Sequence, residues 1–115
     1  MVNLIVKWDA EGTHYWPNPP EEFIVFGNIH EHIFHFECYL PVSVKSVEDR
    51  PLELLQVRRE LMAELKTKYG DPLNFNGMSC EGISKILSEI IWNTYKIRAR
   101  VVVMEDNFVG AEYWD

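Results

Sequence analysis

His30-Glu31-His32-Ile33-Phe34-His35-Phe36 is the stretch that decides the fold of this chain. It opens a segment rich in aromatic and β-branched residues over about 30–47, which predicts one strand, or two strands interrupted near Pro41. Because proline cannot donate to a strand ladder, we expect Pro41 at a sheet edge or a bulge. Side chains two residues apart on a strand point to the same face, so His30 and His32 can present parallel imidazoles to one ion.

A third histidine precedes this strand, in Thr13-His14-Tyr15-Trp16. Residues 2–8 predict a first strand that extends toward Trp16, and His14 approaches the histidine pair if the two strands are neighbours. Three histidine nitrogens leave the fourth position of a tetrahedral zinc ion free for water or a ligand, as in catalytic zinc sites. The spacing alone leaves open a second interpretation, in which the pair lies on the surface and His14 caps an aromatic cluster.

The apolar period becomes helical after residue 53. A stripe of apolar residues predicts a helix over 54–70 that ends at Gly70, before Asp71-Pro72. This stripe consists of Leu54, Val57, Leu61 and Leu65. Ser79 is the expected N-cap of a second helix, which runs to about Tyr95.

Two further strands are expected after the helices. The β-branched residues of 100–104 predict the first, and residues 109–114 are its expected return partner. The order ββααββ predicts a single α+β domain over 1–115, with a four-stranded antiparallel sheet and two helices on one face.

The composition limits the function classes. With 115 residues, 47% hydrophobic and 13% aromatic, the chain can form one core and is not a disordered sequence. The net charge of −7 argues against nucleic acid and anionic membranes as partners. Cys38 and Cys80 have no metal-type or disulfide-type spacing, and we expect no signal peptide and no membrane span. A reduced, cytoplasmic setting is therefore expected.

The strands carry more large apolar residues than two helices can cover. These residues include Trp8, Trp16, Phe36, Tyr39, Tyr113 and Trp114. Exposed apolar area costs roughly 25 cal/mol per Å², so we expect the chain to form a homo-oligomer. Joining sheet edges around a ring would also remove exposed strand edges.

Several motifs follow one another in the order found in a known family. His14 and His30-Glu31-His32-Ile33-Phe34 resemble the zinc histidine and the His-Gly-His-x-Phe/Tyr motif of the 6-pyruvoyl- and 6-carboxy-tetrahydropterin synthases. Glu53-Leu54-Leu55-Gln56-Val57-Arg58 is similar to the Asp-Phe-x-x-Leu-Lys start of the family's first helix. Met78-Ser79-Cys80-Glu81 is similar to its Pro-Thr-Ser-Glu motif, and Glu105-Asp106 to the Glu-Thr that ends its third strand.

The resemblance covers nearly the whole chain. It implies the tunnelling fold (T-fold), in which ββααββ subunits assemble into oligomeric barrels, with a hexamer as the expected assembly. It also implies a zinc ion on His14, His30 and His32.

The resemblance further implies a site for a small heterocycle. Glu105 would bind the amino-pyrimidinone edge of a pterin, because a carboxylate accepts two parallel N–H bonds. Ser79 and Glu81 are expected contacts from the second-helix motif, and Phe26 can stack on a flat ring. The residues alone also allow simpler roles, in which Glu105 ends a strand at a solvated turn and Glu81 stabilises a helix dipole.

The chain departs from the family at positions that handle protons. Phe26 aligns with the family's reactive cysteine, and a phenyl ring cannot be a thiolate, a base or an acid. The segment Tyr69-Gly70-Asp71-Pro72-Leu73-Asn74 has no counterpart of the family's proton-relay histidine. Glu31 replaces the central glycine and adds negative charge beside the expected metal. Cys80 is either a buried small residue or a thiol whose pKa is lowered at a helix start.

Three functions remain open. The favoured one is a binding protein on a tetrahydropterin-synthase-like scaffold that holds a pterin- or nucleotide-like molecule between subunits. The short, divergent sequence also resembles phage proteins, and such a protein could sequester a nucleotide defence signal in the host cytoplasm. The alternatives are a zinc-dependent lyase in which Glu31 or His35 transfers protons, and a purely structural oligomer.

Overall fold

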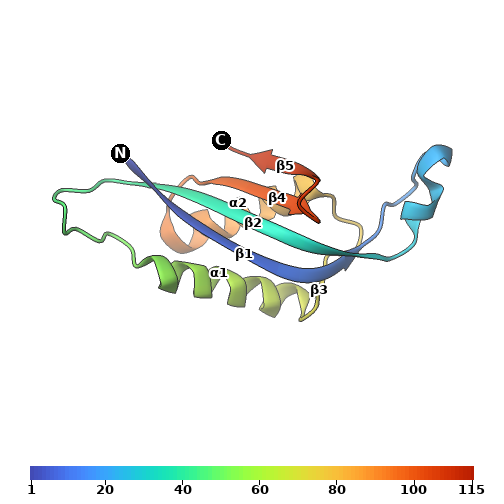
Figure 1. Ribbon diagram of the computed structural model, residues 1–115, viewed down its shortest axis with the longest axis horizontal. Helices are drawn as coiled ribbons and strands as arrows, with labels where there is room; N and C mark the ends of the chain where they lie inside the picture. The colour runs from blue at the N-terminus through green and yellow to red at the C-terminus, as the bar shows by residue number, and fades with distance from the viewer.

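A computed structural model describes residues 1–115 as an α+β architecture, in which a twisted open sheet is covered on one face by two helices (Figure 1). The elements in chain order are β1 (Val2–His14), the 3-10 helix η1 (Glu21–Gly27), β2 (His30–Val42), α1 (Leu54–Tyr69), β3 (Leu73–Asn74), α2 (Cys80–Tyr95), β4 (Arg100–Glu105) and β5 (Val109–Tyr113). None of the helices combines the length and the hydropathy that a membrane span requires.

The sheet has five strands in the order β3-β1-β2-β4-β5. The neighbouring pairs are antiparallel except β1 and β3, which run parallel. The expected four-stranded antiparallel sheet is therefore wrong in strand number, and the sheet is mixed. The missed strand β3 pairs Leu73 and Asn74 with Gly12 and Thr13, and two residues are too short to produce an alternating sequence pattern.

Strand β2 is one uninterrupted strand that pairs with β1 along its whole length. It ends at Val42, before the predicted limit at residue 47. Pro41 pairs with Asn3 on one side only, because the last pair between β2 and β4 joins Tyr39 to Arg100. The expectation that Pro41 lies at an edge is thus confirmed, because β2 has no strand on its β4 side at this position. The N–H that proline lacks is therefore not needed for a hydrogen bond to β4.

Both predicted helices are confirmed, and their ends have identifiable causes. The Glu53 carboxylate accepts a hydrogen bond from the Gln56 N–H at 2.7 Å and caps α1, which stops at Gly70, where φ is +91°. Ser79 caps α2 by accepting the Gly82 N–H at 3.1 Å. The predicted stripe of α1 buries Val57, Leu61 and Leu65, whereas Leu54 is 45% exposed at the first turn.

The core lies between the helices and the even-numbered side chains of β1 and β2. Trp8 and Phe36 belong to it, with 4% and 0% of their surface exposed. The expectation that helices could not cover these two rings is therefore wrong, because the strand alternation turns both rings toward the helices. Trp16 and Trp114 are exposed, as expected, at 43% and 67%.

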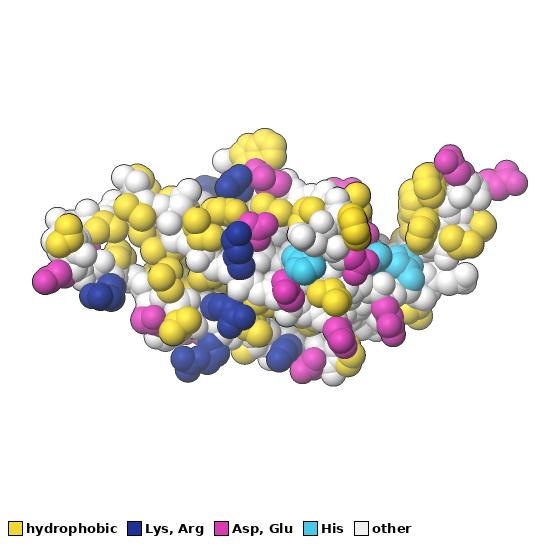
Figure 2. Space-filling model, in the orientation of Figure 1, with side chains coloured by type: hydrophobic (Ala, Val, Ile, Leu, Met, Phe, Trp, Pro, Cys, Tyr) yellow, Lys and Arg dark blue, Asp and Glu magenta, His cyan; other side chains and the backbone are white.

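The largest group of exposed apolar side chains lies outside the sheet, on and beside η1. This segment extends away from the end of β1 and β2 as an arm, which is yellow over much of its surface in Figure 2. Its exposed residues are Phe23, Ile24, Val25, Phe26 and Ile29. The sequence did not predict this helix, whose first turn follows Pro19-Pro20 and carries Glu21 and Glu22.

Candidate metal centre and cavity

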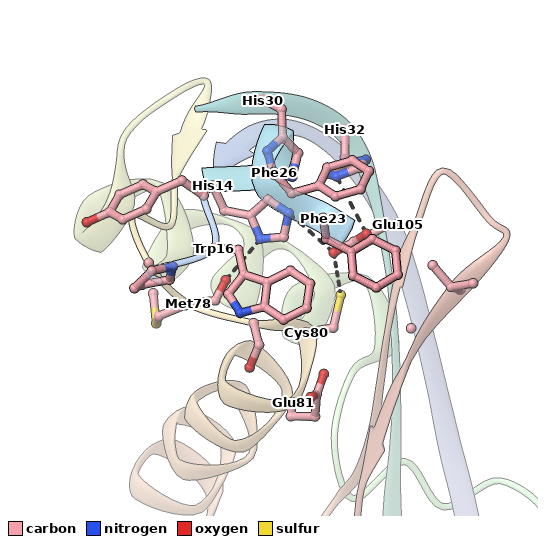
Figure 3. Close-up of a pocket in the computed structure, with 16 residues that line it drawn as sticks. His14, Trp16, Phe23, Phe26, His30, His32, Met78, Cys80, Glu81 and Glu105 are labelled. Carbon is pink, nitrogen blue, oxygen red and sulfur yellow. Dashed lines mark hydrogen bonds and ion pairs between the residues drawn. The ribbon is translucent and has the colours of Figure 1, made fainter. Parts of the chain in front are cut away.

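The three candidate metal ligands meet at one end of the sheet (Figure 3). The register of β1 and β2 pairs His14 directly with His30, and His32 follows two residues along on the same face. One possible ligand atom from each histidine lies within 4.8 Å of the others. The expected approach of His14 from the neighbouring strand is confirmed.

Each imidazole has an acceptor for its Nδ1 atom. Nδ1 of His14 lies 2.9 Å from the Met78 carbonyl oxygen, and Nδ1 of His30 lies 2.9 Å from the Asn28 carbonyl oxygen. Nδ1 of His32 lies 2.6 Å from the Asp106 carboxylate. In a neutral imidazole these bonds place the proton on Nδ1 and leave the lone pair on Nε2, which is the usual outer arrangement of metal-bound histidines.

The Nε2 atoms fit a metal ion. Nε2 of His14 and Nε2 of His32 are buried and have no hydrogen-bond partner. Buried polar atoms without partners are rare, and a bound cation satisfies both lone pairs at once. Burial also lowers the pKa of His14, which favours the neutral form that a metal requires.

Glu105, at the end of β4, faces the same space. Its carboxylate oxygens lie 3.3 Å from His14 Nε2 and 3.5 Å from His32 Nε2. The Cys80 thiol donates to this carboxylate over 3.3 Å, and burial together with the Glu105 charge raises the pKa of Cys80. The alternative of a lowered Cys80 pKa is thus wrong, because burial and a nearby carboxylate both disfavour the thiolate.

A cavity of about 620 Å³ opens beside the histidines. It brings together all the predicted site residues, namely His14, Phe26, His30, His32, Ser79, Glu81 and Glu105. One wall is aromatic: the rings of Trp16 and Phe23 stack with centroids 5.7 Å apart, and the Phe26 ring lies 5.5 Å from that of His30. Phe26 therefore packs beside the histidines at the position expected for a reactive cysteine.

The first turn of α2 forms the opposite side of the cavity. Ser79 already accepts the capping bond described above, so its oxygen has a structural role. The Glu81 side chain lines the cavity from this turn, near Cys80, and is exposed (Figure 3).

Glu31 and His35 do not line this cavity. They occupy odd-numbered positions on β2, whose side chains point to the other face of the sheet. Nδ1 of His35 lies 2.6 Å from the Asp9 carboxylate on that face. The lyase alternative therefore loses both of its expected proton-transfer groups.

Asp106 is a site residue that the sequence did not predict. Its carboxylate bonds His32 through one oxygen and accepts the Ile33 N–H at 2.8 Å through the other. Asp106 and Asn107 both have positive φ, so they form the tight turn between β4 and β5 that aims the carboxylate back at β2. The hydrogen bond from His32 lowers the pKa of Asp106. The Asp-Asn pair predicts a turn, but only the register of the sheet shows that the Asp106 carboxylate reaches His32.

Comparison with protein-family models finds no match for the chain, and a search of curated proteins finds none either. The likeness to tetrahydropterin synthases therefore rests on the sequence motifs alone.

Proposed function

We propose that this chain is a cytoplasmic small-molecule-binding protein on a tetrahydropterin-synthase-like scaffold. It holds a zinc ion on His14, His30 and His32, and a pterin- or nucleotide-like heterocycle in the adjoining cavity. The observation that carries the proposal is the convergence of two buried Nε2 atoms, neither with a hydrogen bond and both facing the Glu105 carboxylate, on a cavity with an aromatic wall. Zinc suits three imidazole ligands and leaves one position for the bound molecule.

The recognition groups favour a flat ligand rich in hydrogen-bond donors. Glu105 supplies a half-buried carboxylate beside the histidines, and Glu81 supplies an exposed one from the first turn of α2. Trp16, Phe23 and Phe26 offer faces and edges on which a ring can pack. The combination matches an amino-pyrimidinone, whose N–H groups lie along one edge.

Binding is favoured over lyase chemistry because the cavity lacks the family's reactive thiol and the two proton-transfer groups expected for a lyase, Glu31 and His35. Phe26 has no ionisable group, and the Cys80 thiol is held protonated by its surroundings. A zinc-dependent lyase remains the second candidate, since an open metal position can activate a ligand hydroxyl.

We also propose that the chain forms a homo-oligomeric barrel, with six as the expected number of subunits. The exposed apolar arm around η1 supports self-association, because Ile24, Val25 and Ile29 are 61%, 64% and 72% exposed. The outer side of β5 has no strand neighbour and is free to pair. Native mass spectrometry should show a single closed oligomer, and a monomer at micromolar concentration would contradict this part of the proposal.

Calorimetric titration of the zinc-loaded protein with 7,8-dihydroneopterin tests the binding function. We expect saturable binding that weakens at least tenfold in Glu105→Gln, because the amide offers one acceptor where the carboxylate offers two. Glu112→Gln is the matched control, since Glu112 pairs with Arg100 away from the cavity. Absence of binding by the unmodified protein would contradict the proposal. Steady turnover of 7,8-dihydroneopterin triphosphate would instead favour the lyase.

A further inference from the structure

We infer that the molecule bound in this cavity carries no phosphate group. This inference rests on the proposed function and narrows its ligand class to a free heterocyclic base, a nucleoside or an unphosphorylated pterin. The charged side chains that line the cavity, apart from its histidines, are the carboxylates of Glu81 and Glu105. A phosphate group would enter a negatively charged space without a lysine or arginine to bind it.

None of the 11 basic residues of the chain lines the cavity. On the face shown in Figure 2, the dark blue side chains lie away from the arm end of the molecule, where histidine and acidic side chains gather. Lys7 pairs with Glu37 at 3.1 Å on the uncovered sheet face, and Arg100 pairs with Glu112 at 3.2 Å. The net charge of −7 adds a general repulsion of anions.

The start of α2 compensates only in part for this lack of cations. A helix N-terminus attracts anions through free N–H groups and the positive end of its dipole. Here the Ser79 side chain caps the Gly82 N–H at 3.1 Å, and the Ile83 N–H makes the ordinary helical bond to the Ser79 carbonyl oxygen at 2.9 Å. Glu81 in the first turn already places a negative charge against the dipole.

A zinc ion on the histidines would not make the net charge of the cavity positive. Its two positive charges are matched by the two carboxylates, so the loaded cavity is formally neutral and suits a neutral ligand. The aromatic wall also suits such a ligand, because a ring can be buried against it without desolvating a charge.

The test compares matched ligands that differ only in phosphate: guanosine with guanosine 5′-monophosphate, and 7,8-dihydroneopterin with its monophosphate. Titration calorimetry of the zinc-loaded protein at low ionic strength should show at least tenfold tighter binding of each phosphate-free ligand. The difference should narrow at 0.15 M salt, where the Debye length falls to about 8 Å. Glu81→Gln should strengthen binding of the monophosphates selectively. Glu64→Gln, an exposed change on α1, is the control.

The outcomes separate this inference from the proposed function. Equal or tighter binding of the monophosphates would overturn the inference, by showing that a partner subunit or the metal supplies the missing cation, while the binding function would stand. The inference would also be overturned if Glu81→Gln left the difference in affinity between the phosphate-free ligands and the monophosphates unchanged. If neither member of either pair binds, the proposed function fails and the inference fails with it.

Discussion

Replacing Asp106 by asparagine tests whether the histidines form a metal site or only a polar cluster. In the native chain the carboxylate binds His32 Nδ1 at 2.6 Å and the Ile33 N–H at 2.8 Å, one oxygen for each. Asparagine tolerates the positive φ of this turn and retains one oxygen. Its NH₂ group, however, would face the N–H of His32, so one of the two bonds must be lost.

The expected loss of zinc affinity can be estimated from the role of the hydrogen bond between His32 and Asp106. Outer partners of metal-bound histidines fix the tautomer and the ring orientation, and their mutation typically weakens metal binding about 10- to 100-fold. This range corresponds to about 1.4–2.7 kcal/mol of binding free energy. We therefore expect the zinc dissociation constant of Asp106→Asn to rise by about 10- to 100-fold.

Competition with a chromophoric zinc chelator at pH 7.5 measures this change. Asp9→Asn is a matched control, because Asp9 makes the same 2.6 Å contact with a histidine, His35, on the opposite face of the sheet. The zinc affinity of Asp9→Asn should stay within about twofold of that of the unmodified protein, because the change is remote from the site. Equal zinc affinities in Asp106→Asn and the unmodified protein, or equal losses in both variants, would refute the reasoning.

Two further predictions concern stability and thiol chemistry. An added Cβ at Gly110 would overlap the Val103 carbonyl oxygen, so Gly110→Ala should lower the free energy of unfolding in urea by about 1–3 kcal/mol. Gly82→Ala, which has room for its methyl group, should not destabilise α2, and an equal loss in both variants would contradict this account. Burial raises the pKa of Cys38 from 9.0 to about 12, so Cys38 should resist thiol labelling in the folded protein at pH 8. Mass spectrometry of the labelled peptides should show that Cys38 reacts only as the protein unfolds. Equal labelling rates of Cys38 in the folded and unfolded protein would contradict the burial argument. Because the thiol ionises at lower pH in the unfolded chain, the contribution of Cys38 to the free energy of unfolding is complete below about pH 9 and is lost as the pH rises toward 12.

The long elements were predictable from the sequence because their signals are local. Ser79 caps one helix and Gly70 ends the other, and both roles depend on the residue and its immediate neighbours. The pairing of His14 with His30 was also predictable, since a period of two places His30 and His32 on one face as soon as β1 lies beside β2.

The parts that were missed depend on tertiary contacts. Strand β3 has two residues and exists because the Phe75 N–H reaches the Thr13 carbonyl oxygen, a contact with no sequence signature. The acceptors of His14 and His30 are main-chain carbonyls, which every residue possesses. Asp106 reaches His32 only through the register of β2 and β4. The burial of Trp8 was missed because the sequence shows strand alternation without showing which face the helices cover.

The metal content of the purified protein tests the central claim most directly. Elemental analysis combined with native mass spectrometry should find about one zinc ion per chain, as three histidine ligands and an open position imply. His30→Ala and His32→Ala should lose this metal, whereas His35→Ala should retain it, because His35 points to the other face. Metal-free protein that takes up no zinc, or full metal content in His30→Ala and His32→Ala, would contradict the account.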